Sequence, residues 1–596
     1  MSHVNSTTFT IVIVLFLLVT LIGFAAARWH RGGNDLMHLN EWGLGGRSFG
    51  TFIGWFLLGG DTFTAYTFIA VPSAVYLTGA VSGFFAVSYT AMTFPIGLMF
   101  LPRLWSVCRV HNYVTPADFI RGRYGSRGLS LAVAFTGILA LMPYIALQLV
   151  GIQAVITVLG VNASSSNTYV KDLPLFIAFL VLAVFTYVSG LRAPALIAFV
   201  KDFLVYVMIL VAIFYIPIRV GGWTHIFSVA ETHLKAISPT TKKATGVFIP
   251  TKGESQLAFA SLALGSAMAL FVYPHTITGT LSTKRRAVIK RNMALLPFYG
   301  IVLTLIALLG YMALADKTTA ANVKKAGNAQ LAVPYLFQHL FPSWFAGVAF
   351  SAIVIGALVP AAIMAIAAAN LFTRNIFKEF FKPDASPRME TKVSQWGSLV
   401  VKIGALLFAL ELPRTFSINL QLLGGIWVLQ VLPSLVAGLF TRWFHRWALL
   451  TGWLAGMAFG TIAAYKVATP TTSHWAGSTD IEFGHTVYIG LTAVLMNIVI
   501  AVILTAILNA PALGAIVAPY QSRGAFGARD FDKYVWYPPI PEYDGAVPEH
   551  RDLALVGQLA REQAAEVPVL GAATFQRARA MVRDDLRATG LLTRAD

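Results

Sequence analysis

An aspartate lies within one of the most apolar stretches of the chain, Leu57-Leu58-Gly59-Gly60-Asp61-Thr62-Phe63-Thr64-Ala65-Tyr66-Thr67. A carboxylate at the centre of a membrane costs about 2.5–3.5 kcal/mol on insertion scales, so it is retained where it has a partner or a task. The pair Gly59-Gly60 permits unwound backbone, whose carbonyls can bind a cation. Asp61 is therefore a candidate for cation coordination, proton carriage or gating. Alternatively, it caps the following helix by accepting from the Phe63 or Thr64 amide.

Two other polar groups interrupt apolar runs. His275 follows Pro274 in Phe271–Leu281, and it either titrates near neutral pH or donates to backbone freed by the proline. Asp202 follows Lys201 near the start of another run. These two charges are either interfacial and snorkelling, or Asp202 is a carboxylate near an inner gate. Adjacent helical residues face different sides, so an ion pair between them is not assumed.

The composition shows which elements must position these groups. Of the 596 residues, 57% are hydrophobic and 12% are charged, about half the usual charged share of a soluble domain. This composition fits about a dozen membrane spans of ~20 residues. It excludes a soluble enzyme, a disordered scaffold and a nucleic-acid binder.

Apolar runs predict an all-α membrane protein with about 13 transmembrane helices. The expected spans are 9–27, 50–76, 80–102, 129–159, 174–190, 194–218, 255–281, 293–314, 344–372, 394–411, 417–441, 447–467 and 484–509. If the N-terminus is outside, the inside loops hold about 21 Lys and Arg and the outside loops about 10. Positive residues favour the cytoplasmic side, so this distribution predicts a multi-pass protein with its N-terminus outside and its C-terminus inside.

Two of these spans carry interruptions and lie five spans apart. The second holds Gly59-Gly60 and Pro72, and the seventh holds Gly265 and Pro274. Interrupted helices at corresponding positions suggest two inverted five-helix repeats with a binding site at the breaks. We expect a transporter domain over 1–510 and a cytoplasmic tail over 511–596.

The motifs of soluble enzymes are missing: there is no His-Glu-x-x-His, phosphate loop or Gly-x-Ser-x-Gly elbow. A membrane enzyme acting on lipid would need acid, base or metal ligands clustered at the membrane edge, and the sequence suggests none. A sensor is a further alternative, but the tail is too short for a histidine kinase. The tail over 511–596 can still bind a partner.

Several motifs, taken in order, resemble those of a known family. Glu41-Trp42-Gly43-Leu44-Gly45-Gly46-Arg47-Ser48-Phe49 is similar to a Gly-Arg-Ser lead-in to a first core helix. The others are Thr115-Pro116-Ala117-Asp118-Phe119-Ile120-Arg121-Gly122-Arg123-Tyr124, Ser189-Gly190-Leu191-Arg192-Ala193, Ser266–Lys284 and Asn370-Leu371-Phe372-Thr373-Arg374-Asn375-Ile376-Phe377. Over about residues 9–510 the chain resembles the sodium:solute symporter family, and within it the monocarboxylate permeases.

The resemblance implies a LeuT-type fold, with a 5+5 inverted-repeat core over about 50–218 and 255–441, and alternating access. It also implies a cation site at Gly60, Phe63, Gly356, Val359 and Pro360, near Asp61 and Asp202. The family has hydroxyl side chains where this chain has Val359 and Pro360, and hard cations need oxygen ligands. The usual sodium site therefore lacks part of its ligand set, and a proton on Asp61 is an alternative to sodium.

The resemblance further implies a substrate site on five core helices. The implied positions are Thr62, Thr64, Tyr66, Thr67, Tyr89, Tyr144, Gln148, Ser266, Tyr273 and His275, with Gln421, Trp427 and Gln430 as candidates by location. With no arginine clearly inside a span, a substrate carboxylate would be met by half-helix N-termini and hydroxyls.

The resulting prediction is a symporter of a bacterial inner membrane, not an enzyme and without an organic cofactor. It would import lactate, pyruvate, acetate or propionate with a proton or sodium ion. Its expected partners are the monocarboxylate, the coupling cation and the lipid bilayer, with a small accessory membrane subunit as a further candidate and no nucleic acid. The alternative is a family member for another small solute, such as an amino acid, a sugar or urea.

Overall fold

The computed structural model describes residues 5–28, 38–161, 168–237, 244–411, 417–468, 474–482 and 485–510, and short stretches beyond. The chain divides into two compact units, Met1–Ala510 and Pro511–Asp596. In the second unit, β3 (Arg523–Gly524) pairs antiparallel with β4 (Gly527–Ala528). Most of the predicted tail lies outside the described residues.

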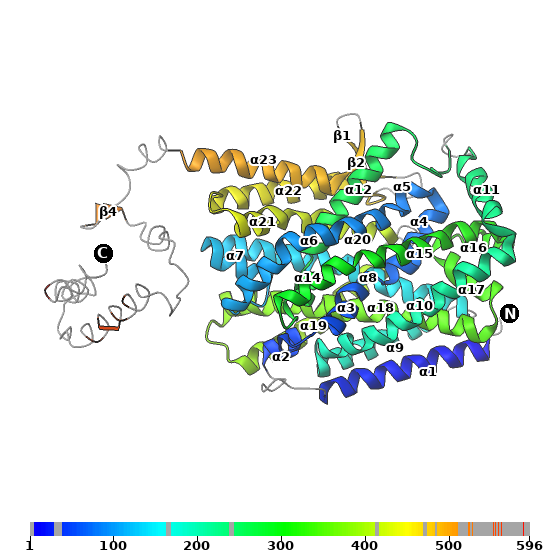
Figure 1. Cartoon of the computed structure of the whole chain (residues 1–596), viewed down its shortest axis with the longest axis horizontal. Coiled ribbons are helices and arrows are strands. Elements are labelled where there is room, and N and C mark those ends of the chain that lie inside the picture. Colours follow the sequence, from blue (N-terminus) through cyan, green and yellow to red (C-terminus); the bar gives the residue numbers. More distant parts are fainter. Residues whose placement is uncertain are drawn as a thin grey trace. The chain divides into compact units, whose positions relative to one another are not determined.

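The first unit is a bundle of long helices (Figure 1). Within its described part, ten helical segments are long and apolar enough to cross a membrane. These ten segments include Ile418–Phe440, which is made of shorter elements. The individual helices of this unit with at least 19 residues are α1 (Ser6–Ala25), α6 (Phe85–Val110), α8 (Arg127–Leu159), α9 (Thr168–Ser189), α10 (Arg192–Val220), α12 (Gly253–Val272), α15 (Pro297–Ala315), α18 (Ser343–Phe372), α19 (Pro387–Glu411), α22 (Arg446–Lys466) and α23 (Ile489–Leu508).

Shorter elements connect or extend these helices. They are η1 (Ala26–Arg28), α2 (Leu39–Leu44), η2 (Gly45–Arg47), α3 (Thr51–Gly60), η3 (Tyr66–Ala70), α4 (Val71–Thr78), α5 (Ala80–Gly83), α7 (Pro116–Tyr124), α11 (Gly222–Lys235), α13 (Pro274–Leu281), α14 (Arg286–Leu295), α16 (Lys317–Ala326), η4 (Ala329–Leu331), α17 (Ala332–Leu340), η5 (Thr373–Phe381), α20 (Ser417–Val428), η7 (Leu429–Val431) and α21 (Leu432–Phe440).

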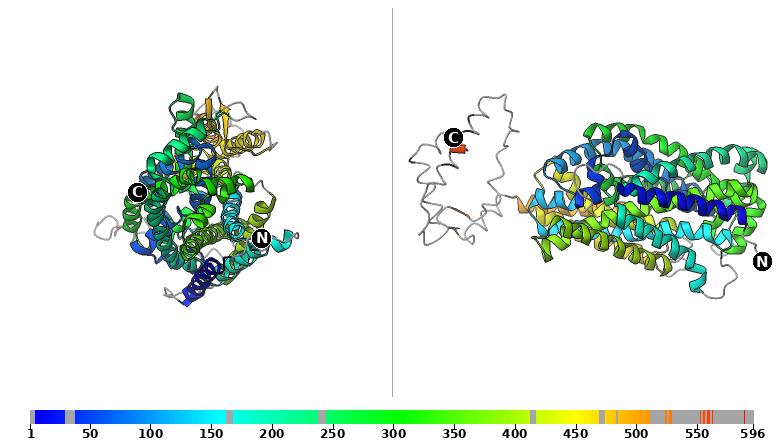
Figure 2. Two further views of the ribbon diagram at one scale, coloured as in Figure 1. Left: turned by 90° about the vertical axis from the view of Figure 1, so that its right-hand side faces the viewer. Right: turned by 90° about the horizontal axis from the view of Figure 1, so that it is seen from below.

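Helix α18 forms the centre of the bundle. Every residue in the most apolar stretch of this helix is buried, and the helix packs against α8, α1, α10 and α19. Its sequence is rich in alanine, and small residues let helix backbones approach closely in membrane proteins. The remaining helices surround it. The start of α1 and the end of α23 lie at opposite ends of the bundle (Figures 1 and 2).

Two helices are broken, at Gly59-Gly60 and at Pro274 as the sequence predicts, whereas the chain stays helical at Pro72 in α4 and Gly265 in α12. Helix α3 ends at Gly60, and a turn separates it from the π-helical η3 and from α4. The second break lies between α12 and α13, where Tyr273 has an extended ψ of 135° and Pro274 begins the next helix. Proline has no amide hydrogen to continue a helical ladder, which favours a break here, although Pro143 and Pro360 lie inside continuous helices.

The all-α expectation needs one local correction. Residues predicted to begin the last span instead form the strand β2 (His485–Tyr488), which pairs antiparallel with β1 (Thr479–Glu482). Helix α23 begins only at Ile489. The β-branched residues of the hairpin favour strand pairing, so hydropathy alone placed the start of this span too early.

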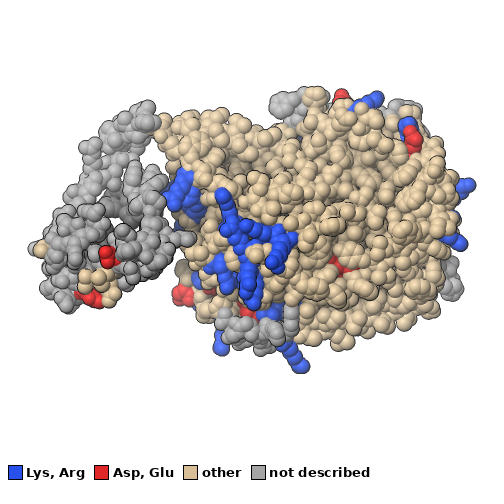
Figure 3. Space-filling model, in the orientation of Figure 1, with Lys and Arg blue, Asp and Glu red and all other residues tan. Residues whose placement is uncertain are grey.

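Positive charge gathers toward one end of the first unit (Figure 3). Five exposed basic residues lie just before α14 and in its first two turns, namely Lys284, Arg285, Arg286, Lys290 and Arg291, and Figure 1 labels α14 in the same half of this unit. We call this the basic end of the bundle.

Candidate functional site

The two helix breaks meet in the interior of the bundle. Nε2 of His275, in the first turn of α13, lies 3.1 Å from Oδ2 of Asp61, which follows α3. The side chains are 0% and 7% exposed. The structure thus brings together an acid and an imidazole that the sequence presented as separate candidates.

The capping alternative for Asp61 is wrong. The Phe63 amide donates to the Gly60 carbonyl at 3.2 Å, and the Thr64 amide donates to Oγ1 of Thr67 at 3.0 Å. Oδ1 of Asp61 has no hydrogen-bond partner in the described part of the chain. The carboxylate is therefore not retained here to complete a helix end.

Aromatic rings surround the Asp61–His275 pair. Tyr144 packs edge-on against His275 with ring centroids 5.6 Å apart, and Tyr273 lies 5.1 Å from the same imidazole. Tyr66 and Tyr89 form a second ring pair at 6.3 Å. All four rings are buried. They come from α8 (Tyr144), from the break between α12 and α13 (Tyr273), from η3 (Tyr66) and from α6 (Tyr89), so four separate elements bring predicted tyrosines together.

The amides of the first break already have acceptors. Ala65 donates to Oε1 of Gln148 at 3.0 Å, and Tyr66 donates to Oγ1 of Thr64 at 3.0 Å. Oγ1 of Thr62 donates to the Gly59 carbonyl at 2.6 Å. These polar side chains hold the break in place, so this half-helix start does not offer free amides to an anion as the sequence suggested.

The buried polar atoms without a hydrogen-bond partner in the described ranges include Tyr66 OH, Ser266 Oγ, Thr276 Oγ1 and Gln421 Oε1, as well as both ring nitrogens of His275 and Oδ1 of Asp61. Buried polar groups nearly always have a hydrogen-bond partner. In addition, the first amides of a helix have no acceptor within it, and those of α13 belong to His275 and Thr276. A small polar ligand can satisfy such groups.

Two residues suggested on α20 and η7 use their polar groups elsewhere. The Trp427 indole donates to Oγ1 of Thr461 on α22 at 3.1 Å. Nε2 of Gln430 donates to the Ile426 carbonyl at 3.0 Å, and its Oε1 accepts from Asn497 on α23 at 3.2 Å. Both therefore join α20 and η7 to the outer helices.

A lysine ammonium occupies the position where the resemblance implies a sodium ion. Nζ of Lys201 on α10 donates to the Gly60 carbonyl and, at 3.0 Å, to the Phe63 carbonyl. It lies 3.3 Å from Oδ1 of Asp202. Lys201 and Asp202 are both fully buried, so the snorkelling interpretation is wrong, and these neighbours do form an ion pair.

The other residues of the implied cation site belong to α18, which faces the first break but provides no side-chain oxygen atom. A Cβ built on Gly356 would lie 3.8 Å from the Phe63 carbonyl oxygen, so α18 does approach the break. Val359 and Pro360 are buried in α18 and have no side-chain oxygen. A sodium ion ~4 Å from the Lys201 ammonium would be repelled by about 4 kcal/mol at an effective dielectric constant of ~20. These residues do not fit a bound sodium ion.

Tyr299 completes this buried cluster. Its hydroxyl on α15 donates to Oδ2 of Asp202 at 2.7 Å, and its ring packs against Phe63 with centroids 4.6 Å apart. Sequence reasoning missed both Lys201 as a ligand and Tyr299. A lysine well inside an apolar run was the available signal for the first, whereas nothing in the sequence singled out Tyr299.

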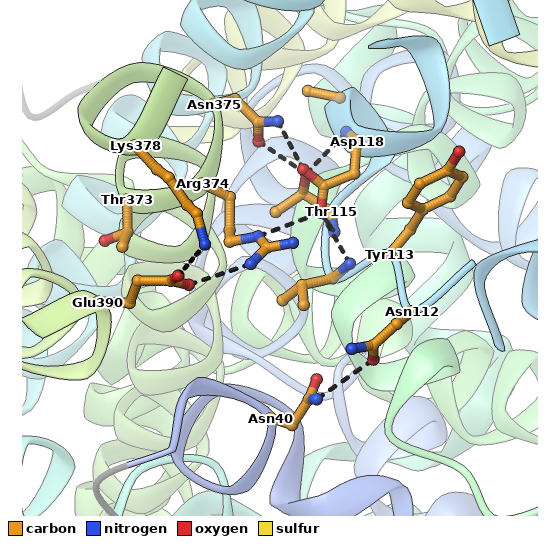
Figure 4. A network of polar contacts seen from close by, with 12 residues as sticks. Asn40, Asn112, Tyr113, Thr115, Asp118, Thr373, Arg374, Asn375, Lys378 and Glu390 are labelled. Carbon is orange, nitrogen blue, oxygen red and sulfur yellow. Dashed lines mark hydrogen bonds and ion pairs between the residues drawn. The ribbon is translucent and has the colours of Figure 1, made fainter. Parts of the chain in front are cut away.

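A polar network ties several elements together near α7 (Figure 4). Asp118 and Thr115 form the capping box of α7, and both also bind Asn375 of η5, at 2.8 Å and 2.7 Å. Arg374 lies 3.7 Å from Asp118 and donates to Glu390 of α19 at 3.1 Å.

Two further contacts extend this network, one within the η5–α19 region and one to η2, which precedes α3. Lys378 also binds Glu390. Arg47 of η2 donates to the Tyr113 carbonyl at 2.7 Å. Burial lowers the pKa of Arg47 to about 10, so it is still charged at neutral pH. The network therefore joins α7, η5 and α19 to one another. Arg47 joins η2 to the loop before α7 through Tyr113.

A cavity of about 490 Å³ lies among other elements. Its walls include residues of η3, α4 and α5, the start of α12 and the β1–β2 hairpin. Ala70, the last residue of η3, lines it, as does the acidic side chain of Glu254. Figure 1 places α4, α5 and the hairpin away from α7, so the hollow and the polar network lie on different parts of the bundle.

Comparisons with known proteins identify the family of this helical membrane protein. The model of the "Sodium:solute symporter family" matches residues 42–460. A "Monocarboxylate transport permease protein" of Rhizobium johnstonii is 49% identical over 514 residues, covering 86% of this chain and 99% of its own. The "Uncharacterized symporter YodF" of Bacillus subtilis is 35% identical over 457 residues, covering 76% and 87%.

A solved structure shows the same fold. A Na⁺-coupled sialic acid symporter superposes with a TM-score of 0.65 at 16% identity, covering 85% of this chain and 98% of that one. This likeness confirms the predicted LeuT-type architecture, while the number of thirteen spans stays a prediction. The relatives are transporters rather than enzymes. The chain is a multi-pass membrane symporter that belongs to the sodium:solute symporter family.

Proposed function

We propose that this symporter imports small monocarboxylates such as lactate, pyruvate, acetate or propionate. The observation that carries the proposal is the 49% identity to a monocarboxylate transport permease, over 99% of that relative's length. The site is consistent with a small substrate that has one polar end. Buried rings supply apolar contact, and the unpartnered atoms of Tyr66, Ser266 and Thr276 supply a few hydrogen-bonding positions.

The substrate carboxylate would bind near the first turn of α13. The amides of His275 and Thr276 point toward the start of that helix, where negative charge is favoured. Asp61 lies beside His275, and its negative charge would oppose an anion bound there. A proton shared by Asp61 and His275 removes this repulsion. Proton and anion would therefore each raise the affinity for the other, as linkage requires.

Alternating access would use the two ends of the bundle differently. The basic end would face the cytoplasm, following the positive-inside rule, with the N-terminus outside and the C-terminus inside a bacterial inner membrane. The network of Asp118, Asn375 and Arg374 would close the cytoplasmic path, while the cavity beside α4 and the β1–β2 hairpin would open outward. Release of substrate inside would then require this network to separate.

Uptake into proteoliposomes tests the proposal. The full-length protein would be reconstituted, and accumulation of labelled pyruvate would be measured with proton and sodium gradients imposed separately. We expect uphill accumulation under at least one gradient, with competition by lactate, acetate and propionate. Accumulation that survives collapse of both gradients would overturn symport. Competition only by an amino acid, a sugar or urea would favour the alternative substrate class.

A further inference from the structure

We infer that the ammonium of Lys201 permanently takes the place of the coupling sodium ion, so that this symporter neither binds nor requires sodium at the first helix break. The inference rests on the proposed function only for the choice of transport substrate. It is carried by the contacts of Lys201, Asp202 and the two carbonyls of the break, which the sequence did not predict.

Two carbonyl oxygens and one carboxylate oxygen surround the Lys201 ammonium. A lysine ammonium has three N–H donors and no acceptor. The three oxygen atoms are the carbonyls of Gly60 and Phe63, and Oδ1 of Asp202. The two carbonyls accept hydrogen bonds, whereas Oδ1 of Asp202 forms an ion pair at 3.3 Å and has no hydrogen bond in the described part of the chain. The charge of the lysine is thus balanced by its sequence neighbour.

The same contacts perform the structural task of a bound cation. Lys201 and Asp202 belong to α10, whereas Gly60 is the last residue of α3 and Phe63 lies in the turn that follows it. Asp202 also accepts from Tyr299 of α15. The ammonium thus holds the unwound backbone against α10 and, through Asp202, against α15, without a diffusible ion.

The site is also too crowded for a second cation. A single methyl group added at Gly60 would lie 3.0 Å from Nζ of Lys201 and 3.2 Å from Oδ1 of Asp202. On the α18 side, Val359 and Pro360 provide no alternative oxygen atoms. The two carbonyl oxygens implied as sodium ligands are therefore already bound by lysine, and a sodium ion could reach both of them only if the ammonium left.

A second buried lysine serves as an internal comparison. Lys402 of α19 is also fully buried, but its Nζ has no hydrogen-bond partner in the described part of the chain. No carboxylate forms an ion pair with it among the described residues. Removing its charge should not create a sodium site, which makes Lys402→Ala a matched control.

The wild-type protein gives the first test and needs no variant. Labelled pyruvate uptake under an imposed proton gradient would be compared with sodium or choline on both sides of the proteoliposome. Binding of radioactive sodium to the purified full-length protein would be measured in parallel. We expect equal initial rates and no saturable sodium binding, and either strict sodium dependence or saturable sodium binding would overturn the inference.

The variant Lys201→Ala gives the second test. It leaves two carbonyls and the Asp202 carboxylate around an empty position, so we expect saturable sodium binding and a sodium-dependent rise in the thermal midpoint. Lys201→Ala/Asp202→Asn should lose both effects, and Lys402→Ala should never show them. A folded Lys201→Ala protein that gains neither effect would contradict the assignment, and if it does not fold, the wild-type binding measurement decides.

The two proposals fail in different ways. Strict sodium dependence with intact monocarboxylate uptake would overturn the role of Lys201 and leave the proposed function standing. Failure of any imposed gradient to drive monocarboxylate uptake would overturn the proposed function. In that case sodium binding to the wild type and to Lys201→Ala would still test the lysine.

Discussion

Nε2 of His275 and Oδ2 of Asp61 lie 3.1 Å apart and connect the breaks of two helices that are distant in the sequence. One residue follows α3 and the other begins α13. A change of protonation at this pair would therefore alter a contact that both interrupted helices share. This contact links the proposed coupling step to the elements that must move during transport.

Asp61→Asn should abolish uphill accumulation while preserving exchange of substrate across the membrane. The amide has a similar shape but cannot carry the proton, so the gradient no longer drives transport. We expect accumulation to fall at least about tenfold, which corresponds to ~1.4 kcal/mol of lost coupling. Imposed-gradient uptake and substrate counterflow in proteoliposomes measure the two functions separately.

A double-mutant cycle tests whether Asp61 and His275 act as one unit. If they share the proton, His275→Gln and Asp61→Asn should each cause the coupling defect, and the double variant should be no worse than either one. Residues in contact characteristically depart from additivity in this way. Additive losses in the initial rate of gradient-driven uptake would show two independent roles.

Substrate affinity should depend on Ser266 and not on Trp427. Ser266 offers a buried hydroxyl without a described partner, whereas the Trp427 indole is bonded to Thr461. Ser266→Ala should raise KM for pyruvate roughly two- to twelvefold, the equivalent of ~0.5–1.5 kcal/mol for one hydrogen bond. Trp427→Phe serves as the matched control and should leave KM unchanged in the same assay.

The polar network near α7 should control access to the only cysteine of the chain. Cys108 is fully buried near the end of α6, and its carbonyl accepts from the Tyr113 amide at 2.9 Å. Arg374→Ala removes contacts to both Asp118 and Glu390, so we expect faster labelling of Cys108 by a maleimide. Equal rates in the wild type and the variant would show that the network does not close this path.

A surface charge pair supplies the control for the labelling experiment. Arg121 binds Glu379 at 3.0 Å, and its side chain is 35% exposed. Exposed pairs are typically worth about 0–1 kcal/mol. Arg121→Ala should therefore change the labelling of Cys108 much less than Arg374→Ala does.

The buried ion pair between Glu41 and Arg192 should matter for stability. Both side chains are 1% exposed, and Nε of Arg192 donates to Oε1 of Glu41 at 2.8 Å. Removing one partner of a buried pair leaves an uncompensated charge and costs about 3–5 kcal/mol. Glu41→Gln should lower the thermal midpoint of the detergent-solubilised protein far more than Arg127→Ala, which removes a largely exposed pair with Glu379.

Sequence and structure contribute differently to the candidate site. Hydropathy and the Gly59-Gly60 and Pro274 interruptions predicted both broken helices, because backbone hydrogen bonding and φ restrictions act locally. Local reasoning misplaced the start of the last span, where β2 precedes α23. The family resemblance offered Trp427 as a substrate residue by its location alone, but the direction of a side chain on a helix depends on which neighbours pack around it.

By itself the sequence determined a helical membrane protein with two interrupted spans and intramembrane charges, because apolar length and the cost of burying charge are properties of the chain alone. Only the tertiary structure decided which charges meet. Asp61 pairs with His275, and Lys201 fills the position implied for sodium. These partners come from helices far apart in the chain, so their distance is set by packing around α18 rather than by any local pattern of residues.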